Sequence, residues 1–190
     1  MGGKPASQFH DAATVPALAT VDFQSLYKQE FSYAWRTLRR LGVRERDLPD
    51  VAHDLFIVVF RHLSDFDPSR PVRPWLFGIA FRVVSDYRHS ARFARETLGE
   101  APESVDRTPP ADEQIGERQE RQAVMRVLDE LDLDRRAVLV MHDLEGHPVP
   151  EIAAALAIPV ATAYSRLRLA REDLAAAIKR FRAREERRRP

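Results

Sequence analysis

The stretch EIAAALAIPVATAYSRLRLA, residues 151–170, decides the fold of this chain. Its first residues favour a helix, and Pro159 prevents that helix from continuing, because a proline inside a helix removes a hydrogen bond and clashes with the preceding turn. A proline is tolerated in the first turn of the helix that follows. Two short helices joined by a tight turn predict a helix-turn-helix, a motif that often docks on DNA.

Apolar residues in this stretch recur at helical spacing, so one face of each helix is expected to be buried. In the first helix these residues are Ile152, Ala153 and Leu156. In the second helix they are Val160, Ala163, Leu167, Ala170 and Leu174. The turn between the helices includes Ala157, at a position that often requires a left-handed backbone, where glycine is favoured.

The opposite side of the second helix combines small and basic side chains, which suits a helix in the DNA major groove. Ala161 and Ser165 permit close approach, Arg168 is expected to reach base edges, and the flanking arginines are expected to hold phosphates. The residues assigned to DNA here are Ala161, Thr162, Tyr164, Ser165, Arg166, Arg168 and Arg171. Residues 164–190 carry ten basic and four acidic side chains, although the whole chain has a net charge of only +1. The alternative is a helical hairpin with a solvated basic face.

The rest of the chain predicts an all-α protein with two small helical domains joined by a flexible acidic linker. The stretch GEAPESVDRTPPADEQIG, residues 99–116, is rich in proline and acidic residues and has too few large apolar residues to build a core. We expect a disordered N-terminal arm over 1–20, a first domain over 21–96, the linker over 97–121, a helix-turn-helix domain over 122–184 and a basic tail over 185–190.

Caps and breakers place the individual helices. Asp22 and Asp47 are expected to cap the first two helices, and Gly42 is expected to end the first near Leu41. Three prolines exclude regular helix over 64–74, and a third helix is expected over 75–93. The second domain is expected to have helices over 117–130, 134–144, 148–156 and 159–183, with Asp132 or Asp134 as a cap.

Composition excludes several classes of protein. The chain has no cysteine, which rules out disulfides and thiolate metal sites and is compatible with a cytoplasmic location. No apolar run approaches the roughly 20 residues that cross a bilayer, and the N-terminus lacks the pattern of a secretory signal, so no membrane insertion is expected. We find no glycine-rich phosphate loop and no catalytic constellation. The prediction is therefore a protein that is not an enzyme and takes no cofactor.

Two distant stretches together resemble a known family. DLPDVAHDLFIVVFRHLSDFDPSRPVRPWLFGIAFRVVSDYR, residues 47–88, is similar to the second conserved region of bacterial extracytoplasmic-function sigma factors. LDELDLDRRAVLVMHDLEGHPVPEIAAALAIPVATAYSRLRLAREDL, residues 128–174, is similar to their fourth. The order and spacing of the two regions also fit. The resemblance implies a subunit that binds core RNA polymerase, recognises two promoter elements, directs transcription initiation and is in many cases held by an anti-sigma factor.

The same resemblance assigns roles to residues of the first domain. The polymerase-binding helix would present Asp50, Asp54, Leu55 and Phe56. The minus-ten element would be met as a single strand, which requires a basic surface and a pocket for an unstacked base. The residues implied for it are Phe66, Ser69, Arg70, Arg73, Arg82, Asp86 and Arg88. The second helix of the helix-turn-helix would read the minus-thirty-five element as duplex.

The chain departs from the family pattern at a few positions. His53-Asp54 stands where members usually have Gln-Glu, and Arg82 stands where Asn is common. A basic residue is usual where Tyr164 or Leu169 stands. Two aromatic residues on the first domain, Trp75 and Tyr87, have two interpretations: they stack on unpaired bases, or they pack in the core, as aromatics on core-forming helices more often do.

Two other functions remain open at this point. His10-Asp11, His53-Asp54 and His142-Asp143 are pairs of potential metal ligands, as a helical metal-dependent phosphohydrolase would need. A helix-turn-helix regulator that acts without polymerase is the other alternative, and such regulators usually bind palindromes as symmetric dimers. Such a regulator is distinguished from a sigma factor by whether DNA binding requires core polymerase.

Overall fold

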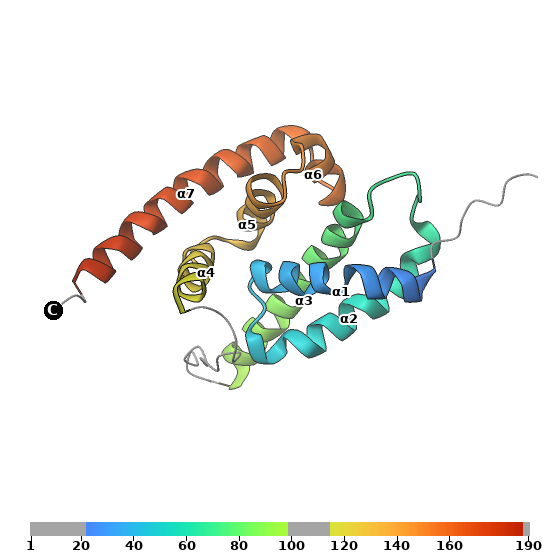
Figure 1. Ribbon diagram of the computed structural model, residues 1–190, viewed down its shortest axis with the longest axis horizontal. Helices are drawn as coiled ribbons and strands as arrows, with labels where there is room; N and C mark the ends of the chain where they lie inside the picture. The colour runs from blue at the N-terminus through green and yellow to red at the C-terminus, as the bar shows by residue number, and fades with distance from the viewer. Residues whose placement is uncertain (1–21, 99–114, 188–190) are drawn as a thin grey trace, which may run out of the picture.

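The computed structural model describes residues 22–98 and 115–187, and every regular element in these two ranges is helical. This confirms the all-α prediction. Three helices, α1, α2 and α3, form a bundle in the N-terminal half, and α4 to α7 form the C-terminal half (Figure 1). The predicted arm over 1–20 and residues 188–190 of the basic tail lie outside the described residues.

Helix α1 spans Phe23–Leu41 and begins and ends where its capping residues predict. The Asp22 side chain accepts a hydrogen bond from the Ser25 backbone N–H at 2.9 Å, which satisfies one of the free amides of the first turn. Gly42 ends the helix with a φ of 99°, a left-handed conformation that costs glycine little. Both cap predictions are confirmed.

Helix α2 spans Leu48–His62 and follows a short 3-10 turn, η1, over Glu45–Asp47. The prediction that Asp47 caps this helix is wrong, because its side chain makes no capping hydrogen bond. The Asp47 carboxylate instead accepts hydrogen bonds from the Tyr87 hydroxyl at 2.5 Å and from Arg44 Nε at 2.7 Å. Burial raises the pKa of Asp47, but these two hydrogen bonds outweigh it and hold the pKa below its ordinary value.

Helix α3 spans Val72–Leu98 and therefore begins three residues earlier than the prediction of Trp75. Pro74 falls in its first turn, where the backbone amides have no partner within the helix in any case, so this proline does not exclude helix. Before α3, the chain forms a 3-10 turn, η2, over Leu63–Asp65 and then an irregular loop over 66–71. The expectation that most of this segment is irregular is thus met.

The C-terminal half comprises α4 (Ile115–Leu128), α5 (Leu133–Leu139), the π-helical turn η3 (Val140–Leu144), α6 (Val149–Ala155) and α7 (Val160–Glu186). Asp132 is the cap of α5, since its side chain accepts a hydrogen bond from the Arg135 N–H at 3.0 Å. Helix α3 runs to Leu98 and α4 begins at Ile115, so the predicted linker over 97–121 overlaps both helices. Its central residues, 99–114, lie outside the described residues.

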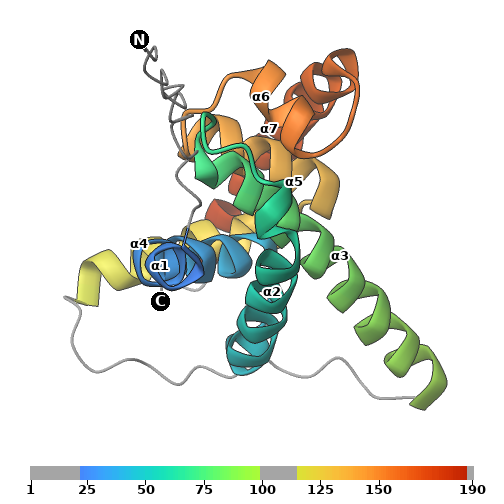
Figure 2. The ribbon, with the colours of Figure 1, turned by 90° about the vertical axis from the view of Figure 1, so that its right-hand side faces the viewer.

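The two halves share one continuous hydrophobic core. Helix α6 lies against α3, and α5 lies against α1, as the two views show together (Figures 1 and 2). The core joins Leu38, Leu55 and Phe77 of the N-terminal half to Val138 and Ile152 of the C-terminal half. The sequence predicts two domains, and the contact between them is a feature that only the structure reveals.

Among the described helices, none is by itself both long and apolar enough to cross a membrane. Val149–Ala155 and Val160–Arg184 meet that test only when taken together, and they are bent by 107° at the turn between them.

Candidate nucleic-acid and polymerase interfaces

Helices α6 and α7 have the geometry of a helix-turn-helix. Their axes are bent by 107°, and the turn between them comprises residues 156–159. Both values match the motif, whose helices cross at roughly 90–120° over a turn of 3–4 residues. Ala157 has a φ of 54°, which confirms the left-handed position expected in the turn. The Ile158 N–H closes the turn by donating to the Ala153 carbonyl at 2.9 Å.

One face of α7 packs into the core as its spacing predicts. Ala163, Leu167 and Ala170 are buried, and Leu174 is partly buried against the same core. Val160 is an exception, because 43% of it is exposed. It is the first residue of α7, where the helix is less covered than at Ala163, Leu167 and Ala170. On α6, the three predicted inner residues, Ile152, Ala153 and Leu156, are all buried.

The opposite side of α7 is open to solvent. Ala161, Ser165, Arg168 and Tyr164 are exposed, and Thr162 is partly exposed. Ala161, Ser165 and Arg168 are each about one helical turn apart, so they form a single continuous face. The small side chains of Ala161 and Ser165 leave the helix backbone accessible, and the longer side chain of Arg168 extends beyond them.

The three arginines of α7 that were assigned to DNA, Arg166, Arg168 and Arg171, have different partners. The Arg166 guanidinium donates to Asp134 at 2.6 Å and its side chain is only 25% exposed, so Arg166 ties α7 to α5. The assignment of Arg166 to DNA stays a prediction. Arg171 donates to Asp143 at 2.6 Å, and these hydrogen bonds hold the pKa of Asp143 below its ordinary value. Arg168 pairs with Glu172 at 2.6 Å on the exposed face itself.

An open groove of about 720 Å³ runs beside this face. Residues of η3, the start of α6 and the side of α7 line it. Its lining includes His142, Val149, Tyr164, Leu167, Arg168 and Arg171. Four of these residues belong to α7, so the groove is part of the same surface as the proposed reading face.

The loop before α3 is held in shape by its own side chains. The Asp67 carboxylate accepts hydrogen bonds from the Ser69 backbone N–H at 3.0 Å and from the Ser69 hydroxyl at 2.7 Å. These hydrogen bonds lower the pKa of Asp67. Arg70 forms an ion pair with the same carboxylate at 3.4 Å. Phe66 packs on Trp75 with ring centroids 4.9 Å apart, so Trp75 has a packing role and anchors the loop to α3.

The basic residues assigned to the minus-ten element do not all lie on one surface. Arg82 and Asp86 are exposed and one turn apart on α3. Arg88 points elsewhere, since its guanidinium lies 2.9 Å from the position that a Cβ at Gly42 would occupy. Arg73 is paired with Glu30 at 3.0 Å and lies 5.0 Å from the centre of the Tyr33 ring. Arg88 therefore lies beside Gly42 and Arg136, at the junction between α1 and α5, and its assignment to the minus-ten element stays a prediction.

The expected polymerase-binding helix, α2, has two kinds of assigned residue. Asp50 and Asp54 are exposed and one turn apart, as predicted. Leu55 and Phe56 are buried, at 0% and 5% exposure, and belong to the core. In this structure these two side chains pack inside the protein, and their assignment to polymerase binding stays a prediction. Phe60 lies further along α2 and is 64% exposed, although the sequence pattern did not single it out.

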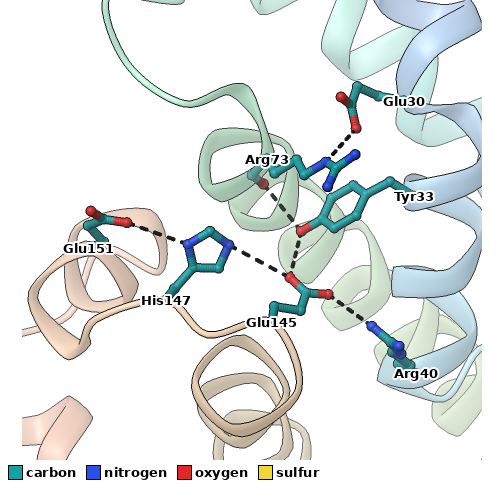
Figure 3. Close-up of polar contacts among 7 residues, drawn as sticks. All are labelled: Glu30, Tyr33, Arg40, Arg73, Glu145, His147 and Glu151. Carbon is teal, nitrogen blue, oxygen red and sulfur yellow. Dashed lines mark hydrogen bonds and ion pairs between the residues drawn. The ribbon is translucent and has the colours of Figure 1, made fainter.

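Glu145 and Arg136 are important residues that sequence reasoning missed. Arg136 is fully buried, and its Nη1 donates to Asp129 at 2.7 Å. Glu145 receives hydrogen bonds from Tyr33 and Arg40, two residues of the other half (Figure 3). Both stand at positions that look like ordinary polar surface, and their partners Tyr33 and Arg40 are more than 90 residues away along the chain.

The His-Asp pairs do not assemble a metal site in the described part of the chain, where no group of three or more His, Cys, Asp and Glu side chains converges. His142 and Asp143 are bonded to each other at 2.7 Å and to Arg171, a cation that competes with any metal. The first pair, His10-Asp11, lies outside the described residues.

Comparison with known proteins agrees with this geometry. The model of sigma-70 region 2 matches residues 26–93, and the model of sigma-70 region 4 matches residues 121–174. The RNA polymerase sigma factor CnrH of Cupriavidus metallidurans is 34% identical, over 73% of this chain and 76% of that protein. The ECF RNA polymerase sigma factor SigE of Mycolicibacterium smegmatis is 31% identical, over 85% of this chain and 63% of its own length.

Solved structures show the same architecture. CnrH in complex with the cytosolic domain of CnrY superposes with a TM-score of 0.59 at 29% identity, covering 83% of this chain and 87% of CnrH. The sigma factor RpoE from Bartonella quintana, solved with the anti-sigma factor NepR, superposes with a TM-score of 0.62 at 23% identity. The match covers 80% of this chain and 96% of that one, and it supports the fold. With both region matches in the expected order and relatives above 30% identity over most of the chain, this protein belongs to the extracytoplasmic-function (ECF) RNA polymerase sigma factors.

Proposed function

We propose that this sigma factor reads the minus-thirty-five element with the exposed face of α7 and meets the minus-ten element with the loop before α3 and the Arg82–Asp86 face. The observation that carries the first part is the geometry of α6 and α7, which presents Ala161, Ser165 and Arg168 on one open face. A helix with this face fits the major groove, where an arginine makes the commonest specific contact, a bidentate one to guanine.

The contacts of the α7 arginines support a division of labour on DNA. Arg168 is the side chain at the centre of the exposed face, and its partner Glu172 is on the same face one turn away. On binding, the guanidinium exchanges this carboxylate for a base edge. Arg171 stands at the flank and suits a phosphate, as does the basic C-terminal end of the helix. Arg166 supports the helix from below through Asp134.

The surface of α2 around Asp50 and Asp54 is proposed to bind core polymerase, with the exposed ring of Phe60 on the same helix as a further candidate contact. We also infer that the chain has no catalytic step of its own, works in the cytoplasm and is held by an anti-sigma factor. The complex of its relative CnrH with the cytosolic domain of CnrY supports the last inference.

The test of the reading face is promoter selection by the holoenzyme, formed with core polymerase, on a DNA library at several salt concentrations. A base-reading side chain contributes about 1–3 kcal/mol of discrimination at its position, and a phosphate contact weakens all sequences alike. Arg168→Ala should relax preference at one or two base pairs of the upstream element and leave the salt dependence nearly unchanged.

Arg182→Ala is the matched control, because Arg182 is an exposed arginine of the same helix beyond the proposed reading segment. It should leave sequence preference unchanged. If Arg168→Ala lowers affinity uniformly across the library, Arg168 is only a phosphate ligand and the reading face is placed incorrectly.

A further inference from the structure

The N-terminal end of α7 carries an apolar patch that the rest of the domain leaves uncovered. Its members, Pro159, Val160, Ala161 and Tyr164, are all exposed, with 43% of Val160 and 57% of Tyr164 open to solvent. Single exposed apolar residues are common on protein surfaces, but Val160 and Ala161 each lie one helical turn before Tyr164, so these side chains adjoin. No residue over 157–165 carries a charge. This apolar tip therefore contrasts with the arginines that follow it on the same helix.

The turn before α7 fixes the position of the apolar tip. The Ile158 N–H donates to the Ala153 carbonyl at 2.9 Å, and the Ala163 N–H donates to the Pro159 carbonyl at 3.1 Å. The first turn of α7 is thus closed around Val160. A valine in a helix has one strongly preferred χ1 rotamer. The isopropyl group of Val160 is therefore held in one direction before any ligand arrives, and a contact with it costs little conformational entropy.

Val160 is the first member of a row of side chains along α7. Val160, Tyr164, Arg168 and Glu172 follow one another at intervals of four residues, so they lie along one side of the helix. The row changes from apolar to charged along its length, and Arg168 and Glu172 form an ion pair at 2.6 Å. Tyr164 and Arg168 also line the same groove, together with Val149. The apolar tip and the proposed base-reading arginine are therefore parts of one surface.

An apolar side chain has one complementary group in the major groove of unmodified DNA. Residues at the N-terminal end of a recognition helix are those that contact base edges in a helix-turn-helix complex. The base edges there present hydrogen-bond donors and acceptors, and the methyl group on C5 of thymine is the apolar exception. The phosphates are anionic and gain nothing from a valine. The thymine methyl group is thus the DNA feature that fits the apolar tip.

We propose that Val160 is a specificity-determining residue, which selects a thymine of the upstream element by packing against its 5-methyl group, with the ring of Tyr164 beside the contact. The inference rests on the proposed function, because it requires α7 in the major groove. Eight positions separate Val160 from Arg168, which is about 12 Å along a helix. At about 3.4 Å per base pair, the selected thymine lies within about four base pairs of the base pair that Arg168 reads.

The test removes the methyl group from the DNA and the isopropyl group from the protein, separately and together. Deoxyuridine lacks only the 5-methyl group of thymidine and pairs with adenine in the same way. In a promoter selected by the wild-type holoenzyme, each thymine of the upstream element, on either strand, is replaced singly by deoxyuridine, and the apparent Kd of the holoenzyme is measured by competition. At one thymine within about four base pairs of the position that Arg168→Ala relaxes, replacement should weaken binding about fourfold, the effect of one buried methyl group.

Val160→Ala should bring the ratio of the two Kd values, for uracil and thymine DNA, close to one. It should bind the uracil promoter as well as the wild type does, so the two losses are non-additive, as a direct contact requires in a double-mutant cycle. Val160 is exposed and alanine favours helix, so the fold should be retained. Val124→Ala is the matched control, because Val124 is 51% exposed on α4 and undergoes the same substitution. It should keep the fourfold ratio.

The proposal is overturned if no deoxyuridine within that range weakens binding, or if the Val160→Ala holoenzyme keeps the wild-type ratio. A Val160→Ala protein that binds core polymerase more weakly and keeps the ratio would show that the apolar tip contacts protein instead. Failure of the proposed function gives a different result, since Arg168→Ala would then leave base preference unchanged. If Arg168→Ala relaxes the preference and deoxyuridine has no effect, only the role of Val160 is wrong.

Discussion

Ala157→Gly should stabilise the protein, although glycine usually destabilises. Ala157 has a φ of 54°, and a left-handed backbone costs a residue with a Cβ about 1–2 kcal/mol. Glycine removes that cost but also makes the unfolded chain more flexible, which returns about 0.4–1 kcal/mol. Ala157 is exposed, so its methyl group contributes little to packing. The net expectation is a gain of about 0.5–1 kcal/mol in the free energy of unfolding.

The assay is urea and thermal unfolding followed by far-ultraviolet circular dichroism. For a chain of this size the melting temperature should rise by about 1–4 °C. Ala154→Gly is the matched control, since Ala154 is also exposed but lies within α6, where glycine costs about 1 kcal/mol. The reasoning is refuted if Ala157→Gly destabilises the protein as much as Ala154→Gly does, because the turn would then not be strained.

Three further substitutions test the packing and electrostatics. Asp132→Ala should lower the free energy of unfolding by about 1 kcal/mol through loss of the α5 cap, and amide hydrogen exchange should show the first turn of α5 opening more often. Leu55→Ala truncates a core side chain and should lower the free energy of unfolding by about 2–5 kcal/mol, whereas Asp54→Ala should change it by less than about 0.5 kcal/mol. Equal effects of the two substitutions in urea unfolding would contradict the burial of Leu55. Because Arg171 lowers the pKa of Asp143, the pair stabilises the fold above the ordinary carboxyl pKa of 3.8 and loses this effect as the pH falls through the lowered value. Asp143→Asn should therefore lower the free energy of unfolding at pH 7. In urea unfolding, the difference from the wild type should shrink below pH 4. A difference that persists below pH 4 would contradict the reasoning.

Local features of the sequence were sufficient to predict most of the helices. Asp22, Gly42 and Asp132 mark helix ends because each satisfies backbone groups within a few residues of itself. Asp47 failed as a cap because Tyr87, 40 residues away, recruits its carboxylate. Val160 has the spacing of a core residue but stands at a helix end that nothing covers.

Exposure of the candidate residues was predicted best where a single helix determines it. The exposed face of α7 follows from helical periodicity, so Ala161, Ser165 and Arg168 were placed correctly on its surface. The partners of Arg166 and Glu145 come from other elements of the chain, and no local spacing encodes them. The packing of one half on the other depends on such pairs, which is why the sequence suggested two domains without their contact.

The central claim is that this chain confers promoter selection on RNA polymerase. The most direct measurement is in vitro transcription from a genomic DNA library by core polymerase, with and without the protein, with the start sites mapped by sequencing. The account predicts that the protein directs initiation to a defined set of sites that share an upstream and a downstream element, and that the Arg168→Ala protein changes which upstream elements are selected. Core polymerase that starts transcription at the same sites whether or not the protein is present would contradict it.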